Sequence, residues 1–414
     1  MLNWLYDCYS ILNKVYSDGS FIKQAIASTP IEEKNRALTV KTCYGVLDKD
    51  GELSYYLKVL TEKTPKLAIR TILKISMYAI KYLGKHDYAI TENAVELTKK
   101  LGKKGASGFV NAVIRKFVKT QFNFPNDVEE NLSIKYSYPR FAVKELLDEY
   151  GKERTEKILS SNPPDTCLSF YDIDGEEYLS ARGVQFDKTP FDGVYTAKNF
   201  VRNSDYDDGV YTYQAVGSVA ICEMVGGGGK LLDCCSAPGG KAVRLSHKFD
   251  SVTAFDIHEH RVELIRSYAN RMGVQNVNAT VKDASEYDGA LDSAFDVVLC
   301  DAPCSGLGVV FDNPDIKLRK EKSTVDELNQ VQLRIISTVS KYVKVGGYLC
   351  YSTCSVLPRE NIGVVREFLN QNKNFSIVPT DSPLAHENVD GTVQFLPDIS
   401  LGGGFYFAKL KREK

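Results

Sequence analysis

Two cysteines follow apolar segments in a way that could bring both thiols to one crevice. Cys304 closes the run Asp-Ala-Pro-Cys that begins at Asp301, and Cys354 closes the run Tyr-Ser-Thr-Cys. The apolar segments before them, Phe295–Cys300 and Gly347–Tyr351, predict two strands. An open α/β sheet carries its chemistry beyond the carboxyl ends of its strands. Two thiols in that position, one of them near an aspartate, indicate covalent attack on an electrophilic ring.

A glycine-rich turn follows another apolar segment, Lys230–Asp233. A strand that runs through such a turn into a helix is the nucleotide-binding element of a doubly wound sheet. A phosphate-binding loop of the Walker type is excluded, because Cys235 stands in place of its first glycine and Ala242 in place of its Ser or Thr. The turn residues that we expect to bind a cofactor are Cys235, Ser236, Ala237, Pro238, Gly239, Gly240 and Lys241.

Two aspartates end the next two predicted strands. Asp256 lies 17 residues after Gly239, close to the spacing of about 20 that is usual for an acid that binds ribose hydroxyls. Asp283 ends the following strand and could accept a hydrogen bond from the exocyclic amine of adenine. One such aspartate is usually only a turn former. Two in succession after a glycine turn favour a nucleoside site.

The composition is that of a globular protein with two or three domains. The chain has 414 residues, of which 43% are hydrophobic and 25% are charged. It has no run of about 18 apolar residues, so we expect no membrane span. It also shows no secretory leader, so we expect its ten cysteines to be reduced and the protein to be cytoplasmic.

The net charge of −1 hides an asymmetry along the chain. Residues 1–130 carry about +6, and the remainder carries about −7. A basic first part could follow a phosphate backbone, whereas a solvated helical surface would have the same composition. Charge alone leaves both interpretations open.

The sequence predicts a multi-domain protein with three parts. Residues 1–125 have the apolar spacing of helices, residues 126–225 predict a small α+β connecting module, and residues 226–414 alternate strands with helices. This alternation predicts an α/β, Rossmann-like domain with a mostly parallel sheet of seven strands. The seven are Lys230–Asp233, Ser251–Asp256, Ala279–Lys282, Phe295–Cys300, Gly347–Tyr351, Phe375–Pro379 and Gly404–Leu410.

Taken together, the motifs resemble the RNA 5-methylcytosine methyltransferases that use S-adenosyl-L-methionine. The motifs in question are Ala-Pro-Gly-Gly-Lys at 237–241, Asp-Ala-Pro-Cys-Ser at 301–305 and Thr-Cys-Ser at 353–355. The resemblance extends to Asn313–Lys317 and Leu357–Asn361. Within the helical part, Glu92–Val95 and Val110–Phe117 resemble a NusB-type RNA-binding fold. This pairing is similar to the bacterial ribosomal RNA enzymes of the Sun/Fmu (RsmB) type, which act on small-subunit RNA.

The resemblance implies a role for each residue of the cysteine motifs. Cys354 would be the nucleophile that adds to carbon 6 of cytosine, because carbon 5 alone is too poor a nucleophile to take a methyl group. Cys304 would assist loss of the carbon-5 proton and release of the product. Asp301 would contact the pyrimidine edge and the cofactor site. The implied partner is RNA, ribosomal RNA first, with no metal and no membrane, and we expect a monomer.

Three alternatives remain open. A transfer RNA cytosine-5 methyltransferase would share both cysteine motifs, and an RNA-binding assembly or antitermination factor would keep the fold without catalysis. A zinc site is the third, because Cys300, Cys304, Cys350 and Cys354 form two Cys-x3-Cys pairs. His258 and His260 have the spacing of a metal pair, but no carboxylate cluster accompanies them, so we expect them to face solvent.

The chain departs from the family pattern at several positions. Ala215 replaces an aspartate in the run that begins at Gln214, and Ser169 and Gln394 replace arginines. Gly402–Gly404 precedes the aromatic run in place of Asp-Gly. These departures leave the RNA contacts and the target base open.

Overall fold

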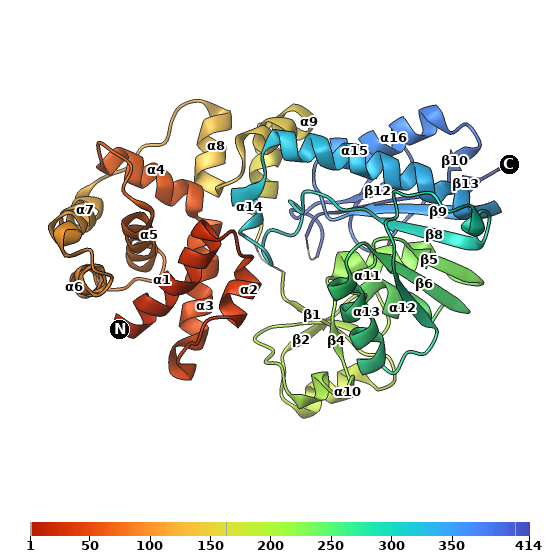
Figure 1. The fold of residues 1–414 in the computed structure, drawn as a ribbon, viewed down its shortest axis with the longest axis horizontal. Coiled ribbons are helices and arrows are strands. Elements are labelled where there is room, and N and C mark those ends of the chain that lie inside the picture. Colours follow the sequence, from red (N-terminus) through yellow and green to blue (C-terminus); the bar gives the residue numbers. More distant parts are fainter. Residues whose placement is uncertain (1, 163, 402) are drawn as a thin grey trace. The chain divides into compact units, whose positions relative to one another are not determined.

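The computed structural model describes residues 2–162, 164–401 and 403–414, which form two compact units (Figure 1). One unit comprises Met1–Leu159 with Val310–Glu321, and the other comprises Ser160–Val309 with Lys322–Lys414. The chain therefore leaves the second unit shortly after Cys304, contributes one short segment to the first unit, and returns. The predicted boundaries at residues 125 and 225 differ from this cut, and the three-part division stays a prediction.

The described secondary structure of the first unit is helical, as predicted for residues 1–125, whereas its residues 126–159 fall in the predicted α+β module. Its central helix α5 (Leu67–Lys81) is buried along most of its length, and the apolar faces of its neighbours pack around it. Trp4, the one tryptophan of the chain, lies in this core. The other helices of the unit are α1 Leu2–Ser17, α2 Ile22–Ala27, α3 Glu33–Asp48, α4 Asp50–Leu60, α6 Asp87–Lys100, α7 Ser107–Lys119, α8 Val128–Tyr136, α9 Arg140–Ser160 and α14 Ile316–Arg319.

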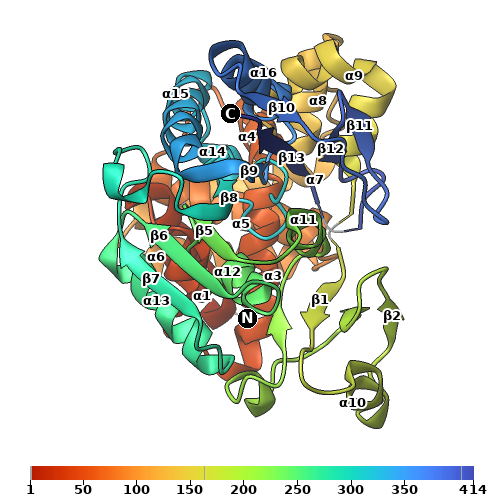
Figure 2. The ribbon, with the colours of Figure 1, turned by 90° about the vertical axis from the view of Figure 1, so that its right-hand side faces the viewer.

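The second unit begins with a small antiparallel sheet and one short helix, α10 (Gly175–Ala181), visible at the lower right of Figure 2. The strand order is β2-β3-β1-β4. Its strands are β1 Thr166–Ser169, β2 Phe186–Lys188, β3 Val194–Ala197 and β4 Thr212–Tyr213. This sheet corresponds to the α+β module predicted before residue 225. The two prolines of the run Asn-Pro-Pro-Asp at 162–165 predict a break after the preceding helix, but Pro163 lies outside the described residues.

A nine-stranded sheet forms the rest of the second unit, with the order β11-β12-β13-β9-β8-β5-β6-β7 and β10 paired to β13. Strands β7, β6, β5, β8 and β9 are mutually parallel, and β13 pairs with β9 in the antiparallel sense. The strands are β5 Lys230–Asp233, β6 Ser251–Asp256, β7 Val277–Val281, β8 Phe295–Asp301, β9 Val343–Thr353, β10 Phe375–Ile377, β11 Glu387–Val389, β12 Thr392–Phe395 and β13 Phe405–Arg412.

Helices cover both faces of this sheet, which is the doubly wound arrangement predicted (Figure 1). Helices α11 (Val216–Val225), α12 (Gly240–Ser246) and α13 (Glu259–Arg271) pack on one face. Helices α15 (Lys322–Val339) and α16 (Ile362–Gln371) pack on the other. Because both faces are buried, the central strands are almost continuously apolar, and this made them visible in the sequence.

The predicted number of strands was wrong, although all seven predicted strands are present. Two further strands, β11 and β12, form a hairpin that extends the sheet beyond β13. Both are short, and β11 is largely polar, so neither has the apolar run that marks the central strands. Among the described helices, none is long and apolar enough to cross a membrane.

Candidate active site

The two cysteine motifs lie side by side because their strands are parallel neighbours. Asp301 at the end of β8 is level with Ser352 near the end of β9, and the amide of Ala302 donates to the Ser352 carbonyl at 2.9 Å. Beyond these strand ends, the Sγ atoms of Cys304 and Cys354 approach to 3.3 Å. Both are free thiols and both are partly exposed. The structure therefore places the two predicted catalytic thiols within hydrogen-bond distance.

The two thiols differ in their environment. The pKa of Cys304 is raised well above its ordinary value, first by its hydrogen bond with Cys354, then by burial and by nearby negative charge, including that of Glu360. The raised pKa favours the thiol form of Cys304, and either sulfur can be the donor in the hydrogen bond between them. A pair in which one member stays protonated leaves the other free to be the nucleophile.

Asp301 holds a lysine beside the thiols. Its Oδ2 accepts from Lys241 Nζ at 2.7 Å, and its Oδ1 accepts from Ser352 Oγ at 2.7 Å. Burial would lower the pKa of Lys241, but the negative charge of Asp301 and this hydrogen bond outweigh burial and raise it. Lys241 is thus a fixed cation beside the thiol pair, a role that its position in the glycine turn did not suggest.

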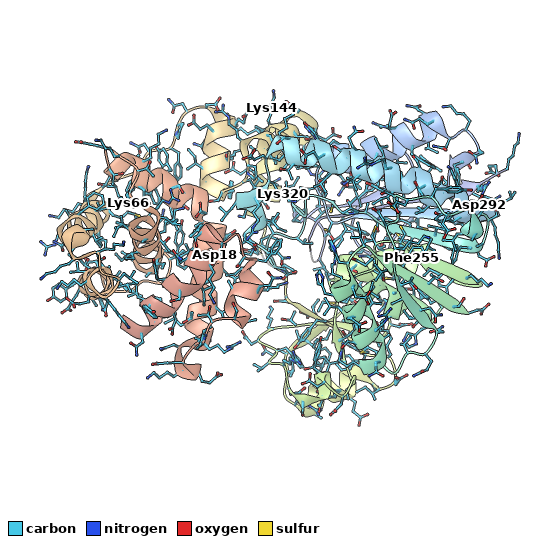
Figure 3. All side chains as sticks on the ribbon, in the orientation of Figure 1. Asp18, Lys66, Lys144, Phe255, Asp292 and Lys320 are labelled. Atoms are coloured by element: carbon cyan, nitrogen blue, oxygen red, sulfur yellow. The ribbon has the colours of Figure 1, made fainter. Side chains whose placement is uncertain are left out.

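The glycine turn between β5 and α12 has the form predicted for cofactor binding. Gly239 has φ +104°, and a Cβ there would meet the Ile265 backbone at 3.2 Å. The Ser236 amide donates to the carbonyl of Phe255 on β6 at 2.8 Å, and the Gly239 amide donates back to the Ser236 carbonyl. Phe255 is labelled among the strands in Figure 3. Backbone therefore lines the start of α12, where a nucleoside can approach closely.

Both predicted nucleoside-binding acids lie at adjacent strand ends. Asp256 ends β6 and is buried. Among the described residues, its carboxylate accepts one hydrogen bond, from the His258 amide to Oδ1 at 3.2 Å, and Arg261 lies 3.4 Å from Oδ2. Asp283 follows β7, and its Oδ1 already accepts the amide and hydroxyl of Ser285. Asp256 therefore retains more capacity for ribose hydroxyls, whereas one oxygen of Asp283 serves its own turn.

Sequence reasoning missed a third acid, Asp233. It is the last residue of β5, it is 0% exposed, and within the described part of the chain neither of its carboxylate oxygens has a hydrogen-bond partner. Burial, followed by the negative charge of Asp301, raises the pKa of Asp233 to about 7. The Ser236 hydroxyl and the Cys235 amide lie near enough to lower this pKa in part, but they make no well-aligned hydrogen bond, so the carboxyl can accept one from a ligand. S-adenosylmethionine carries hydroxyl, amine and ammonium donors, so the residues present fit it.

Comparison with known proteins identifies the family. A model described as 16S rRNA methyltransferase RsmB/F matches residues 226–411, and the NusB family model matches residues 4–119. The probable ribosomal RNA small subunit methyltransferase B of Bacillus subtilis is 30% identical over 97% of this chain and 96% of its own length. The chain belongs to the RsmB/F methyltransferase family. The predicted fold class and the predicted cofactor, S-adenosylmethionine, are confirmed at this level.

Two solved structures share the fold of this RsmB/F-family chain. The crystal structure of PH0851 superposes with a TM-score of 0.84 at 22% identity and covers 99% of each chain. NSun6 from Pyrococcus horikoshii, solved with SFG, superposes with a TM-score of 0.58 at 18% identity over 67% of this chain and 98% of its own. The first likeness covers both the helical and the methyltransferase parts.

Among the departures from the RsmB/F pattern, Gln394 has a structural role, and so does Gln214, the residue before the departure at Ala215. Gln394 accepts from Asn361 at 2.7 Å and donates to the carbonyls of Phe395 and Phe405, so it joins β12 to the segment after Cys354. Gln214 donates to Gly240 O at 3.4 Å, at the start of α12. Ala215 precedes α11 without a side-chain cap, and Ser169 is buried. Nothing in the structure explains the Ser169 replacement, and Gly402 lies outside the described residues.

The zinc alternative conflicts with the side-chain directions in the sheet. Cys300 on β8 packs into the core on one face, whereas Cys350 on β9 packs into the core on the opposite face. The four cysteines therefore cannot converge on one ion. Across residues 2–162, 164–401 and 403–414, no group of three or more His, Cys, Asp or Glu side chains could hold a metal. His258 and His260 are both exposed, and their rings stack with the centroids 5.5 Å apart.

Proposed function

We propose that this protein methylates carbon 5 of a cytosine in small-subunit ribosomal RNA through a covalent bond from Cys354. The observation that carries the proposal is the 3.3 Å approach of the Cys304 and Cys354 thiols beside the Asp301–Lys241 ion pair. The family description supports ribosomal RNA as the substrate. An enzyme with that substrate acts in the bacterial cytoplasm.

The reaction requires the chain to make a cytosine ring nucleophilic at carbon 5. The Cys354 thiolate adds to carbon 6, and the ring electrons shift toward carbon 5. S-adenosylmethionine, when bound, supplies an electrophilic methyl group on a sulfonium centre. Asp301 accepts a hydrogen bond from the exocyclic amine of the ring, and the Lys241 cation offsets the negative charge that develops during addition.

Product release must remove the carbon-5 proton and break the bond to Cys354. Bond formation to the ring removes the negative charge of Cys354, which is one cause of the raised pKa of Cys304. Cys304, which is partly exposed, can then pass its proton to water and act as the base. The Cys304 thiolate takes the proton from carbon 5, and the electron pair of that C–H bond re-forms the ring double bond. The carbon–sulfur bond breaks in the same step, and its electron pair returns to Cys354 as the thiolate.

The helical unit is proposed to bind the RNA. It matches the NusB family, and residues 1–130 carry the positive excess of the chain. The predicted monomeric state stays a prediction.

Bisulfite sequencing of ribosomal and transfer RNA tests this function. Cells that lack the gene should lose protection at a cytosine of small-subunit RNA. The wild-type gene should restore this protection, whereas a gene encoding Cys354→Ala should not. Loss of protection in transfer RNA alone would reassign the substrate, and no change at any cytosine would contradict cytosine-5 methylation and favour a non-catalytic RNA-binding role.

A further inference from the structure

One buried carboxylate connects the loops that carry the two cysteines. Glu360 ends the short turn Pro358–Glu360 after β9 and is 0% exposed. It forms no ion pair with any cation among the described residues. A carboxylate is rarely buried in this way unless several hydrogen bonds replace its hydration. The groups that donate hydrogen bonds to Glu360 therefore indicate its structural role.

The two oxygens of Glu360 reach different loops. Oε1 accepts the backbone amide of Ser305 at 2.7 Å, and Oε2 accepts the hydroxyl of Ser355 at 2.6 Å. Ser305 directly follows Cys304 and Ser355 directly follows Cys354, and the two serine hydroxyls are themselves 3.2 Å apart. The carboxylate thus bridges the residues next to each thiol.

A third element fixes the bridge from the side of α15. Gln332, which is fully buried, donates from Nε2 to Glu360 Oε1 at 3.2 Å and to the carbonyl of Pro303 at 2.9 Å. The hydroxyl of Tyr351 donates to the backbone carbonyl of Glu360 at 2.7 Å. The Cys304 loop is therefore held on both sides of the cysteine, at Pro303 and at Ser305.

We propose that Glu360 is a positioning residue that holds Cys304 and Cys354 at proton-transfer distance, so that its loss slows product release more than bond formation. The expected slowing of product release rests on the covalent mechanism proposed above. The role of Glu360 in setting the distance between the two thiols does not depend on that mechanism. Addition to the ring needs Cys354 alone. Release needs Cys304 close to carbon 5, the neighbour of the carbon that Cys354 has attacked, so release is the step that depends on the distance between the two loops.

Glu360→Gln tests the bridge with little change of shape. Its amide has one acceptor in place of two, so the Ser355 hydroxyl can no longer donate to this side chain while Ser305 keeps its acceptor, and the negative charge is removed. Glu367→Gln is the matched control, because Glu367 is an exposed residue of α16, the helix that follows Glu360. Glu360→Asp keeps the charge but is too short to reach both loops, so it separates the effect of distance from that of charge.

The first readout is bridging of Cys304 to Cys354 by dibromobimane, with the linked peptides identified by mass spectrometry. Losing one buried hydrogen bond should lower the bridging rate about fivefold in Glu360→Gln and in Glu360→Asp, and Glu367→Gln should match the wild type. Bridging at the wild-type rate in a folded Glu360→Gln protein would overturn the proposal. If that variant does not fold, Ser355→Ala removes one of the same bonds, and wild-type bridging there would be equally decisive.

The second readout is single-turnover transfer of labelled methyl groups to ribosomal RNA. Glu360→Gln should form the denaturation-resistant protein–RNA adduct at close to the wild-type rate and release methylated RNA about tenfold more slowly. Equal slowing of both steps would overturn the proposal, because it would indicate general damage to the site. If the wild type bridges its thiols but forms no adduct, the covalent mechanism fails while the spacing role stands.

Discussion

Two buried ionisable side chains in this protein differ in whether the protein supplies their hydrogen-bond partners. In the helical unit, Lys317 gives its three protons to the carboxylate of Asp48 at 2.6 Å and to the carbonyls of Asp48 and Tyr136 at 3.1 Å. In the methyltransferase unit, Asp233 is equally buried and, within the described residues, its carboxylate receives no hydrogen bond. The protein satisfies the first charge itself and leaves the second for a ligand.

This contrast separates residues that serve the fold from residues that serve the reaction. A buried charge with all its partners stabilises one arrangement of the chain, as Lys74 and Asp50 also do at 2.6 Å in the same helical unit. A buried charge without partners costs stability. Such a cost is expected where a binding site must be ready before its ligand arrives.

The largest change in stability should follow from removing Lys317, the buried cation that is hydrogen-bonded to Asp48 and Tyr136. Lys317→Met keeps the apolar part of the side chain but leaves the oxygens around it without a donor. It should lower the free energy of unfolding by about 2–4 kcal/mol, a loss limited by the partial exposure of Asp48 to water. Trp4 lies in the core of the helical unit, so urea unfolding followed by its fluorescence reports this loss. An unchanged Trp4 transition would show that Lys317 is not a structural anchor.

Asp233→Asn should raise the free energy of unfolding, whereas Lys317→Met should lower it. The folded pKa of about 7 lies above the ordinary 3.8, so the folded state favours the protonated acid, and Asp233 costs progressively more stability as the pH rises from about 4 to about 7. The neutral amide removes this cost. The variant should gain about 1–3 kcal/mol at pH 8 and much less at pH 5, as measured by circular dichroism.

The same variant should bind S-adenosylmethionine more weakly, which calorimetry can measure. It should leave the Trp4 transition unchanged, because the change lies in the other unit. A loss of stability at pH 8, or an affinity equal to that of the wild type, would contradict the role given to Asp233.

The smallest effect should come from a pair that neither packs nor binds. Arg366 and Asp390 form an exposed ion pair at 2.5 Å. Arg366→Ala should change the free energy of unfolding by at most about 0.5 kcal/mol and leave methyl transfer unaltered. A loss comparable to that of Lys317→Met would remove the basis of the comparison.

The sequence was sufficient for features that depend on local patterns. The apolar runs of the parallel strands predicted their ends, and those ends carry Cys304, Cys354 and Asp256. The hairpin of β11 and β12 was missed because its strands are short and partly polar. Its position depends on pairing with β13, which no local pattern records.

Long-range partners were beyond prediction from the sequence. Lys317 meets Asp48 across 269 positions, and Glu360 meets Ser305 across 55. Asp233 had no distinguishing local signal, because an aspartate at a strand end usually forms a turn. Only the packing around it shows that its carboxylate lacks a partner.

Trapping of protein–RNA adducts tests the central claim most directly. Cys304→Ala and Cys354→Ala would each be incubated with small-subunit ribosomal RNA and S-adenosylmethionine, then denatured and resolved on a gel. A cofactor-dependent covalent adduct should accumulate with Cys304→Ala and be absent with Cys354→Ala. An adduct with Cys354→Ala, or none with Cys304→Ala, would contradict it.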